Sequence, residues 1–339
     1  IPKVAEGLIY SGAPQNLLTG LTVTVSDGST IDADEYQVHY SVGDAAAESD
    51  PGTIPTGTDA GNYTVHYLVT STNYQDATGQ IVVTIGRKDL TITRTLTDTK
   101  TYVGTNGLSE AQLQELNSSL QVTGAVDGEK DDITVKVTGS PTYDSATAGE
   151  DKTITITYTL TAEGDTNLRN YQVKIGEGEP EEISEEKTCS VEEEVQGKIE
   201  KASVTVTVSD QSSVYDGTEP KVNQEQGDSS DPKAWHITEG ELFNSDTLGV
   251  TLSIPKDSVD AGTYTITGEP DNGNYEVTFV GTDGTNPATY TIDPRPISVT
   301  IGNAEGYYGN KPSLTPGKDQ VTLTEATPGG TTNAGLVDR

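Results

Sequence analysis

A Tyr-x-Gly motif recurs along this chain of 339 residues at nearly regular spacing, and it constrains the fold more than any other feature. Its four tyrosines are separated by 92, 113 and 92 residues. They are Tyr10, Tyr102, Tyr215 and Tyr307. Such a period predicts one structural unit that is used several times.

A second motif keeps the same register. Asp59-Ala60-Gly61 returns 201 residues later as Asp260-Ala261-Gly262. In both copies an Asn-Tyr pair follows at the same offset, as Asn73-Tyr74 and Asn274-Tyr275. Together the motifs predict three complete units and the start of a fourth, with boundaries at 1–86, 87–200, 201–293 and 294–339. Because there is no Met, we expect an internal piece of a longer chain.

The residue pattern predicts an all-β fold. Val, Ile, Thr and Tyr alternate in short runs, and 36 Gly and 16 Pro are spread between them as turns require. One helix is expected over 109–120, where Ser109 is a suitable N-cap and Gln112 completes a capping box. Residues 177–200 contain ten Glu and predict an acidic insertion, either a polar hairpin or a solvated loop.

The charge excludes several classes of partner. The formal net charge of −33 would repel phosphate backbones, so we expect no nucleic acid partner. Anionic membrane surfaces are disfavoured for the same reason, and no direct membrane insertion is expected. A single cysteine, Cys189, excludes an internal disulfide framework.

No catalytic constellation is visible in the sequence, and we expect no enzyme activity and no catalytic, cofactor or metal residues. His39 and His66 lie in strand-like stretches without a third ligand, which is a weak case for zinc. Glutamates on both sides of Cys189 should disfavour its thiolate. Calcium at domain junctions remains a weak alternative, because acidic clusters offer oxygen ligands.

Four apolar side chains are candidates for partner contacts. Trp235 and Phe243 are among the largest apolar side chains of 201–293, and we expect them in the core unless they are exposed. Leu113 and Leu116 lie on the predicted helix, which departs from the repeat pattern. Tyr63 and Tyr264, shared by the second motif, are expected to be structural, with the hydroxyl group reaching a loop backbone.

Several segments resemble known surface modules. Residues 239–248, 260–266 and 273–281 look like the MBG (YGX-type) module of bacterial surface proteins, and Tyr307-Tyr308-Gly309-Asn310-Lys311-Pro312 resembles the start of another. Residues 87–200 are similar to the YDG type, and residues 1–86 resemble the Ig-like repeats of wall-anchored Firmicutes proteins. The resemblance implies tandem β-sandwich repeats in an elongated array, at the cell wall or surface of a bacterium.

Two functions of different class follow as expectations. The first is a non-catalytic extracellular stalk or adhesion module of an adhesin-like protein, and we expect it to be monomeric. The second is a binding module for a host or neighbouring-cell protein, such as immunoglobulin or a mucosal glycoprotein. An accessory polysaccharide-binding segment ranks last, because the sequence shows no row of aromatic residues.

Overall fold

The computed structural model describes residues 1–43, 50–301 and 321–325. By its contacts the chain divides into two compact units. Unit 1 contains Ile1–Lys100, Asn106–Ser145 and Glu150–Lys198; unit 2 contains Thr101–Thr105, Ala146–Gly149 and Ile199–Arg339. Strands account for about 48% of the chain and helices for 4%, which confirms the predicted all-β fold.

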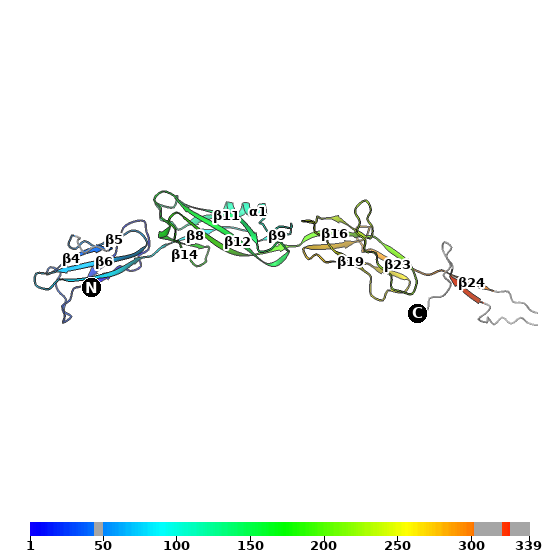
Figure 1. The fold of residues 1–339 in the computed structure, drawn as a ribbon, viewed down its shortest axis with the longest axis horizontal. Helices are drawn as coiled ribbons and strands as arrows, with labels where there is room; N and C mark the ends of the chain where they lie inside the picture. Colours follow the sequence, from blue (N-terminus) through cyan, green and yellow to red (C-terminus); the bar gives the residue numbers. More distant parts are fainter. Residues whose placement is uncertain (44–49, 302–320, 326–339) are drawn as a thin grey trace, which may run out of the picture. The chain divides into compact units, whose positions relative to one another are not determined.

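The first part of unit 1 is built on an antiparallel three-stranded sheet, in the order β4-β6-β7 (Figure 1). Its strands are β4 (Gln37–Val42), β6 (Gly61–Thr70) and β7 (Ala77–Ile85). Two small pairs accompany it: β1 (Pro2–Val4) with β3 (Leu18–Leu21), and β2 (Gln15–Asn16) with β5 (Thr56–Gly57). Alternating apolar residues such as Val65 and Val83 face a shared core with Leu17, so the period of two along each strand forms the core.

Two four-stranded sheets contain the later strands of unit 1. The first has the order β10-β8-β13-β14 and the second the order β11-β12-β15-β9. Their bounds are β8 (Lys88–Thr93), β9 (Thr99–Thr101), β10 (Gln121–Thr123), β11 (Ile133–Tyr143), β12 (Gly149–Ala162), β13 (Tyr171–Ile175), β14 (Glu181–Glu182) and β15 (Thr188–Glu200). Fully buried Leu90 and Ile92 of β8 and Ile154 and Ile156 of β12 supply the core.

The predicted helix is α1 (Glu110–Ser119), and a short 3₁₀ helix, η1 (Leu168–Asn170), precedes β13. The capping box at the start of α1 is confirmed. The Gln112 backbone N–H donates to Ser109 Oγ at 3.2 Å, and the Ser109 N–H donates to Gln112 Oε1 at 2.9 Å. The side chain of Gln112 is itself buried, because it also donates to the Thr97 carbonyl and to Tyr143 Oη.

Unit 2 contains two three-stranded sheets, with the orders β18-β16-β22 and β17-β23-β20. It also contains the pairs β19-β21 and β24-β25. Its strands are β16 (Ala202–Val208), β17 (Gln211–Val214), β18 (Trp235–Glu239), β19 (Val250–Ser253), β20 (Gly262–Thr265), β21 (Thr267–Pro270), β22 (Tyr275–Val280), β23 (Thr289–Asp293), β24 (Ile297–Ile301) and β25 (Val321–Glu325).

Two strands that begin with tyrosine occupy matching places in the sheets. β13 pairs in parallel with β8, with Tyr171 opposite Lys88, and β22 pairs in parallel with β16, with Tyr275 opposite Ala202. The pair Asn73-Tyr74 differs, although it has the same offset in sequence as Asn274-Tyr275. It lies in the turn between β6 and β7, and Tyr74 is 44% exposed.

The structure corrects the prediction for half of the acidic stretch. Residues 188–200 are neither a polar hairpin nor a solvated loop, because they form β15, an internal strand of its sheet. Val191, Glu193, Val195, Gly197 and Ile199 occupy the less exposed face of this strand. The glutamates concealed this alternation. The predicted motif at Tyr307-Tyr308-Gly309 lies outside the described residues.

Candidate functional site

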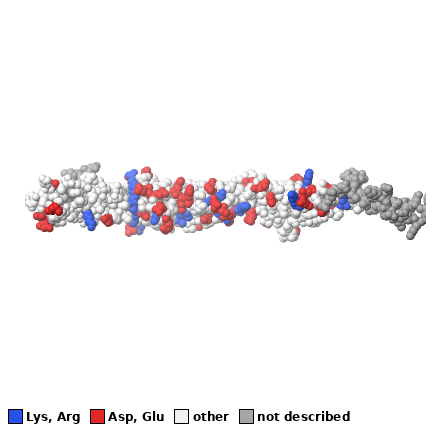
Figure 2. All heavy atoms as spheres, turned by 90° about the horizontal axis from the view of Figure 1, so that it is seen from below, with Lys and Arg blue, Asp and Glu red and all other residues white. Residues whose placement is uncertain are grey.

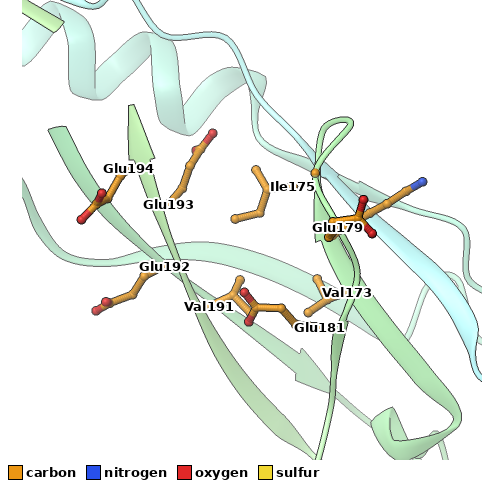
Figure 3. A pocket seen from close by; sticks show the side chains of 10 residues that line it. Val173, Ile175, Glu179, Glu181, Val191, Glu192, Glu193 and Glu194 are labelled. Atoms are coloured by element: carbon orange, nitrogen blue, oxygen red, sulfur yellow. The ribbon is translucent and has the colours of Figure 1, made fainter. Parts of the chain in front are cut away.

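An acidic groove lies between β13, β14 and β15, with a cavity of about 350 Å³. Its inward side is apolar and includes Val173, Ile175 and Val191 (Figure 3). Glu192 and Glu194 alternate with these inward positions on β15 and point away from them. The groove therefore combines an apolar floor with several carboxylates, among which Glu179 and Glu181 also line the cavity.

Glu193 is the one carboxylate of β15 that is held by several partners in this groove. Its Oε1 accepts from Arg94 Nη2 at 2.7 Å, and its Oε2 accepts from Arg94 Nε at 3.1 Å. Tyr158 Oη donates to the same Oε2 at 2.7 Å. Burial and the adjacent Glu193 raise the pKa of Tyr158 above its usual range. The bidentate ion pair with Arg94 and the hydrogen bond from Tyr158 together hold Glu193, and with it β15, in place. Both oxygens of the Glu193 carboxylate are therefore occupied by structural contacts.

Cys189 lies next to this groove in a second depression, beside Glu181 and Ser184. Burial first, and then the negative charge of Glu181, raise the pKa of its thiol. The predicted direction is therefore confirmed, although burial contributes more than the neighbouring anions. A thiol with a raised pKa is a poor nucleophile.

Acidic side chains are scattered over the face seen in Figure 2, where basic ones are fewer. Among the described residues, no three His, Cys, Asp or Glu side chains form a group that could hold a metal ion. His39 and His66 are half-buried positions on the paired strands β4 and β6. Among all the residues that the structure describes, no helix has the length and apolar character to span a membrane.

The four predicted contact residues lie mainly inside the fold. Trp235 is 4% exposed and its Nε1–H donates to the Gln224 carbonyl at 3.1 Å, which favours the core role over the partner role. Leu116 is fully buried and Leu113 half-buried. Phe243 is half-buried against Tyr102, with ring centroids 6.0 Å apart in an edge-on arrangement.

A cluster around Tyr10 joins residues far apart in unit 1; we call it the first tyrosine cluster. The rings of Tyr10 and Tyr171 pack edge-on, with centroids 5.3 Å apart. Both hydroxyl groups donate to Glu129, to Oε1 from Tyr10 and to Oε2 from Tyr171. Burial is the largest cause that raises the pKa of both tyrosines, and the Glu129 carboxylate adds to it.

The same arrangement recurs around Tyr102 in unit 2, as the second tyrosine cluster. Tyr102 and Tyr275 pack edge-on at 5.5 Å. Both hydroxyl groups donate to Asp246 Oδ2, at 2.8 Å from Tyr102 and 2.9 Å from Tyr275. Burial, followed by the hydrogen bond to Asp246, raises the pKa of Tyr102 to about 12.

In each cluster the carboxylate lies in a tight turn that also donates a backbone N–H. The Val126 N–H donates to Tyr171 Oη at 3.2 Å, and the Phe243 N–H donates to Tyr275 Oη at 2.8 Å. Both residues precede the carboxylate of their cluster by three positions. Each tyrosine hydroxyl at the start of β13 and β22 is thus satisfied as donor and acceptor.

The asparagine before each of these strands makes a second matching contact. The Ala60 N–H donates to Asn170 Oδ1 at 2.8 Å, and the Ala148 N–H donates to Asn274 Oδ1 at 3.0 Å. Both alanines precede a glycine. In each case the Asn of an Asn-Tyr pair contacts the Ala-Gly loop, and the Tyr of the same pair packs against the tyrosine of the Tyr-x-Gly loop.

In all three described copies, the tyrosine of the Tyr-x-Gly motif is held by a hydrogen bond from its own backbone N–H group. Its N–H donates to the carbonyl of a residue at the end of a late strand, or just after it, at 2.8 or 2.9 Å. The pairs are Tyr10 with Gly86, Tyr102 with Glu200, and Tyr215 with Asp293. The motif glycines have positive φ in each case: 73° at Gly12, 76° at Gly104 and 77° at Gly217.

The motif glycines also allow neighbouring residues to approach the backbone closely. A Cβ atom at Gly12 would lie 3.1 Å from Val126 Cγ2. At Gly104 it would lie 2.4 Å from Asn244 Nδ2 and 3.1 Å from Phe243 Cβ. Sequence reasoning found the tyrosines and glycines but missed Glu129 and Asp246. Their only shared signal is an apolar residue three positions earlier.

Comparisons with known proteins agree with part of this organisation. Residues 86–178 match the YDG domain family, which confirms a YDG-type module in the segment predicted to be one. No curated protein matches the chain.

Two solved structures are similar at a low level. One is the Bacteroides ovatus mixed-linkage glucan utilization locus SGBP-B in complex with a mixed-linkage heptasaccharide: 12% identity, TM-score 0.18, covering 92% of this chain and 73% of that one. The other is a protocadherin gammaB7 EC3-6 cis-dimer: 12% identity, TM-score 0.23, covering 96% and 83%. At these scores neither likeness carries an argument about function.

Proposed function

We propose that this chain is a non-catalytic segment of a bacterial surface protein, in which successive β repeats are held at fixed spacing. The repeats would be 1–86, 87–200 and 201–293. The observation that carries the proposal is the recurrence of one tyrosine cluster, with the same donors and acceptors, at Tyr10 and at Tyr102. Each cluster connects a Tyr-x-Gly loop of one repeat with the Asn-Tyr strand of the next.

Short linkers support this role. Only Gly86 and Arg87 separate β7 from β8, and only Lys201 separates β15 from β16. A linker of one or two residues leaves little freedom, and a hydrogen-bonded aromatic contact beside it restricts the remaining rotation. Because adhesion proteins need their outermost domains held away from the cell, such a segment suits an extracellular stalk.

Small-angle X-ray scattering of the full chain tests the proposal. We expect a scattering profile typical of a stiff, extended particle. A profile typical of a compact globule, or of a freely jointed chain, would contradict it. A panel of hydrolase substrates measured in parallel should show no turnover, and any saturable turnover would contradict the non-catalytic role.

The acidic groove favours a second candidate, a binding module for a host or neighbouring-cell protein. An apolar floor of Val173, Ile175 and Val191 under carboxylates fits a segment that alternates apolar and cationic residues. Binding of such a peptide should weaken as salt rises and should be lost in a Glu179→Gln, Glu181→Gln double variant, which removes two carboxylates beside the apolar floor. Binding that is unchanged in this variant would exclude the groove, and a glycan array would test carbohydrate partners separately.

A further inference from the structure

The strand β7 is at one edge of the sheet β4-β6-β7, and within the described residues it pairs with β6 alone. Just after its end, Gly86 bonds to the other side. The Gly86 N–H donates to the Leu8 carbonyl, and the Tyr10 N–H donates to the Gly86 carbonyl, both at 2.8 Å. Because alternate residues of a strand direct their N–H and C=O groups to opposite neighbours, four residues of β7 point the same way as Gly86. They are Thr78, Gln80, Val82 and Thr84.

The matching edge is covered further in the other two repeats. In the second repeat β9 pairs with β15, and the Lys198 N–H donates to the Asp98 carbonyl at 3.0 Å. In the third repeat β17 pairs in parallel with β23 over four residues. In the first repeat β1 pairs with β3 instead, and Gly7, between β1 and Leu8, has φ 69°. Among the described residues, no strand therefore covers β7 from 78 to 84 on this side.

β7 also lacks the features that usually protect an exposed strand edge. Such edges normally contain charged residues, proline or a bulge. The nine residues of β7 include no charge and no proline, and their register with β6 has no shift. The matching strand β15 contains four glutamates and one lysine. In a chain with a net charge of −33, β7 is thus an edge where a further strand can add without meeting like charges.

The side chains at this edge favour pairing. β7 ends in five successive β-branched residues, 81–85, and this residue type fits a pleated strand well. Val82 is 55% exposed, and Thr78, Gln80 and Thr84 on the same face of the sheet are exposed too. None of these four side chains carries a charge, so a partner strand would meet a neutral row.

We propose that β7 is a self-association site, at which the β7 strands of two copies of this chain pair in antiparallel about a twofold axis at Ile81. In this register Thr78 of one copy lies opposite Thr84 of the other, and Gln80 lies opposite Val82. All four outward-directed residues then form hydrogen-bonded pairs, and the two three-stranded sheets become one continuous sheet.

The charges on either side of β7 favour a second copy in the antiparallel direction. Asp76 precedes the strand, and Arg87 and Lys88 follow it closely. In an antiparallel pair each acidic end lies beside the basic end of the other copy, whereas a parallel pair would bring like charges together. The register follows as well. A shift by two residues in either direction would bring Asp76 or the already bonded Gly86 into the ladder.

This inference goes beyond the proposed function and departs from the expected monomer. The net charge of −33 still opposes association, so the pair should be weak and should strengthen as salt screens the repulsion. A peptide held in the acidic groove should show the opposite salt dependence. The direction of the salt effect therefore separates the two kinds of binding.

Sedimentation velocity of the full chain over a range of concentrations tests the pair. We expect a reversible monomer–dimer equilibrium that salt shifts toward the dimer. Val82→Lys should weaken dimerisation at least about tenfold, because the two new lysines become diagonal neighbours across the axis and the change acts in both copies. Val214→Lys on β17 is the matched control, since Val214 is 51% exposed, and it should leave the equilibrium unchanged.

Disulfide formation tests the register in a Cys189→Ser background. In the proposed pair Thr78 and Thr84 of different copies are opposite, with Cα atoms about 5.5 Å apart, which a disulfide can span. A Thr78→Cys, Thr84→Cys variant should therefore form a covalent dimer under mild oxidation far faster than either single variant. In the single variants the two equal positions are six residues, or about 20 Å, apart along the pair.

A chain that stays monomeric at every concentration and salt level would overturn the inference, as would equal association of the native chain and Val82→Lys. Rapid crosslinking of a single variant would contradict the antiparallel register, and growth into large aggregates without a dimer would exclude a closed pair. Labelled chain that stays monomeric alone but sediments faster in serum would identify a foreign strand as the occupant and would also overturn it. Each of these outcomes leaves the proposed function intact, because that is tested by scattering from the dilute chain.

Discussion

A single carboxylate holds two tyrosines in each cluster, so individual residues have large effects on how segments distant in sequence are joined. Glu129 accepts from Tyr10, 119 positions before it, and from Tyr171, 42 positions after it. Asp246 does the same for Tyr102 and Tyr275. Hydrogen bonds to a charged acceptor each contribute about 1.5–3 kcal/mol.

Removing the carboxylate should therefore destabilise the first cluster. We expect Glu129→Ala to lower the free energy of unfolding by about 1–3 kcal/mol, because two hydroxyl groups lose their acceptor while Glu129 is half-buried. Chemical denaturation monitored by tyrosine fluorescence would measure the change. Asp127→Ala, two positions away in the same loop and exposed, should be nearly neutral, and equal losses in both variants would refute the role.

The second cluster predicts a loss of stability at high pH. The pKa of Tyr102 is raised to about 12, and the unfolded value is about 10. The unfolded state therefore loses its proton first, so the contribution is fully present below pH 10 and is lost as the pH rises from 10 to 12. Unfolding curves at pH 9 to 12 should show this decrease, and a smaller one in Tyr102→Phe. An identical decrease in both proteins would argue against it.

Substitution of glycines at positive φ can separate the energetic cost of backbone strain from the cost of a steric clash. Gly104→Ala places a methyl group against Asn244 and Phe243 at a positive φ, whereas Gly7→Ala has a similar φ of 69° and open space. We expect about 1 kcal/mol of backbone strain in Gly7→Ala and at least 1–3 kcal/mol more in Gly104→Ala. Equal destabilisation in thermal unfolding would mean that close approach is unimportant.

Contacts between residues close in sequence could be predicted from the sequence, and contacts between residues far apart in sequence could not. The capping box of Ser109 and Gln112 depends on a spacing of three. The hydroxyl groups of Tyr63 and Tyr264 reach the carbonyls of Asp59 and Asp260, four positions earlier, as predicted for shared structural tyrosines. Glu129 and Asp246 escaped notice because their turns share no common sequence.

At the scale of elements, β15 shows how composition can conceal a strand. Its glutamates suggested a solvated segment, yet Glu193 occupies an inward position where Arg94 and Tyr158 neutralise the cost of burial. The alternation of Val191, Val195 and Ile199 was present in the sequence but was outweighed by the charge. A search for alternating apolar residues that allowed one ion-paired acidic residue at an inward position would have predicted this strand.

β15 carries its own prediction. We expect Glu193→Ala to destabilise unit 1 by about 2–3 kcal/mol, because Arg94 loses a bidentate partner and Tyr158 loses an acceptor. Glu194→Ala on the exposed face of the same strand is the control and should change stability by less than about 0.5 kcal/mol. Hydrogen exchange of β15 amides would localise the effect, and unchanged protection would count against it.

At the scale of the whole molecule, the tyrosine cluster recurs while the sheets around it differ. We call each cluster, with its Asn-to-Ala hydrogen bond, a joint. The YDG match covers residues 86–178, and the topology of β8 with β13 is shared by β16 with β22. The sheet β4-β6-β7 lacks that parallel pair, yet its Tyr-x-Gly and Ala-Gly loops make the same contacts. The contacts of the tyrosine clusters are thus more uniform than the sheets around them.

The most direct test is the distribution of distances across the first tyrosine cluster. Spin labels at exposed positions Thr78 and Thr134, with Cys189 replaced by Ser, would report it by pulsed electron resonance. We expect one narrow distance distribution in this background, and a clearly broader one when Glu129→Ala and Asn170→Ala are added. A distribution that is already broad, or that keeps the same width in both proteins, would contradict the claim that the cluster fixes the joint.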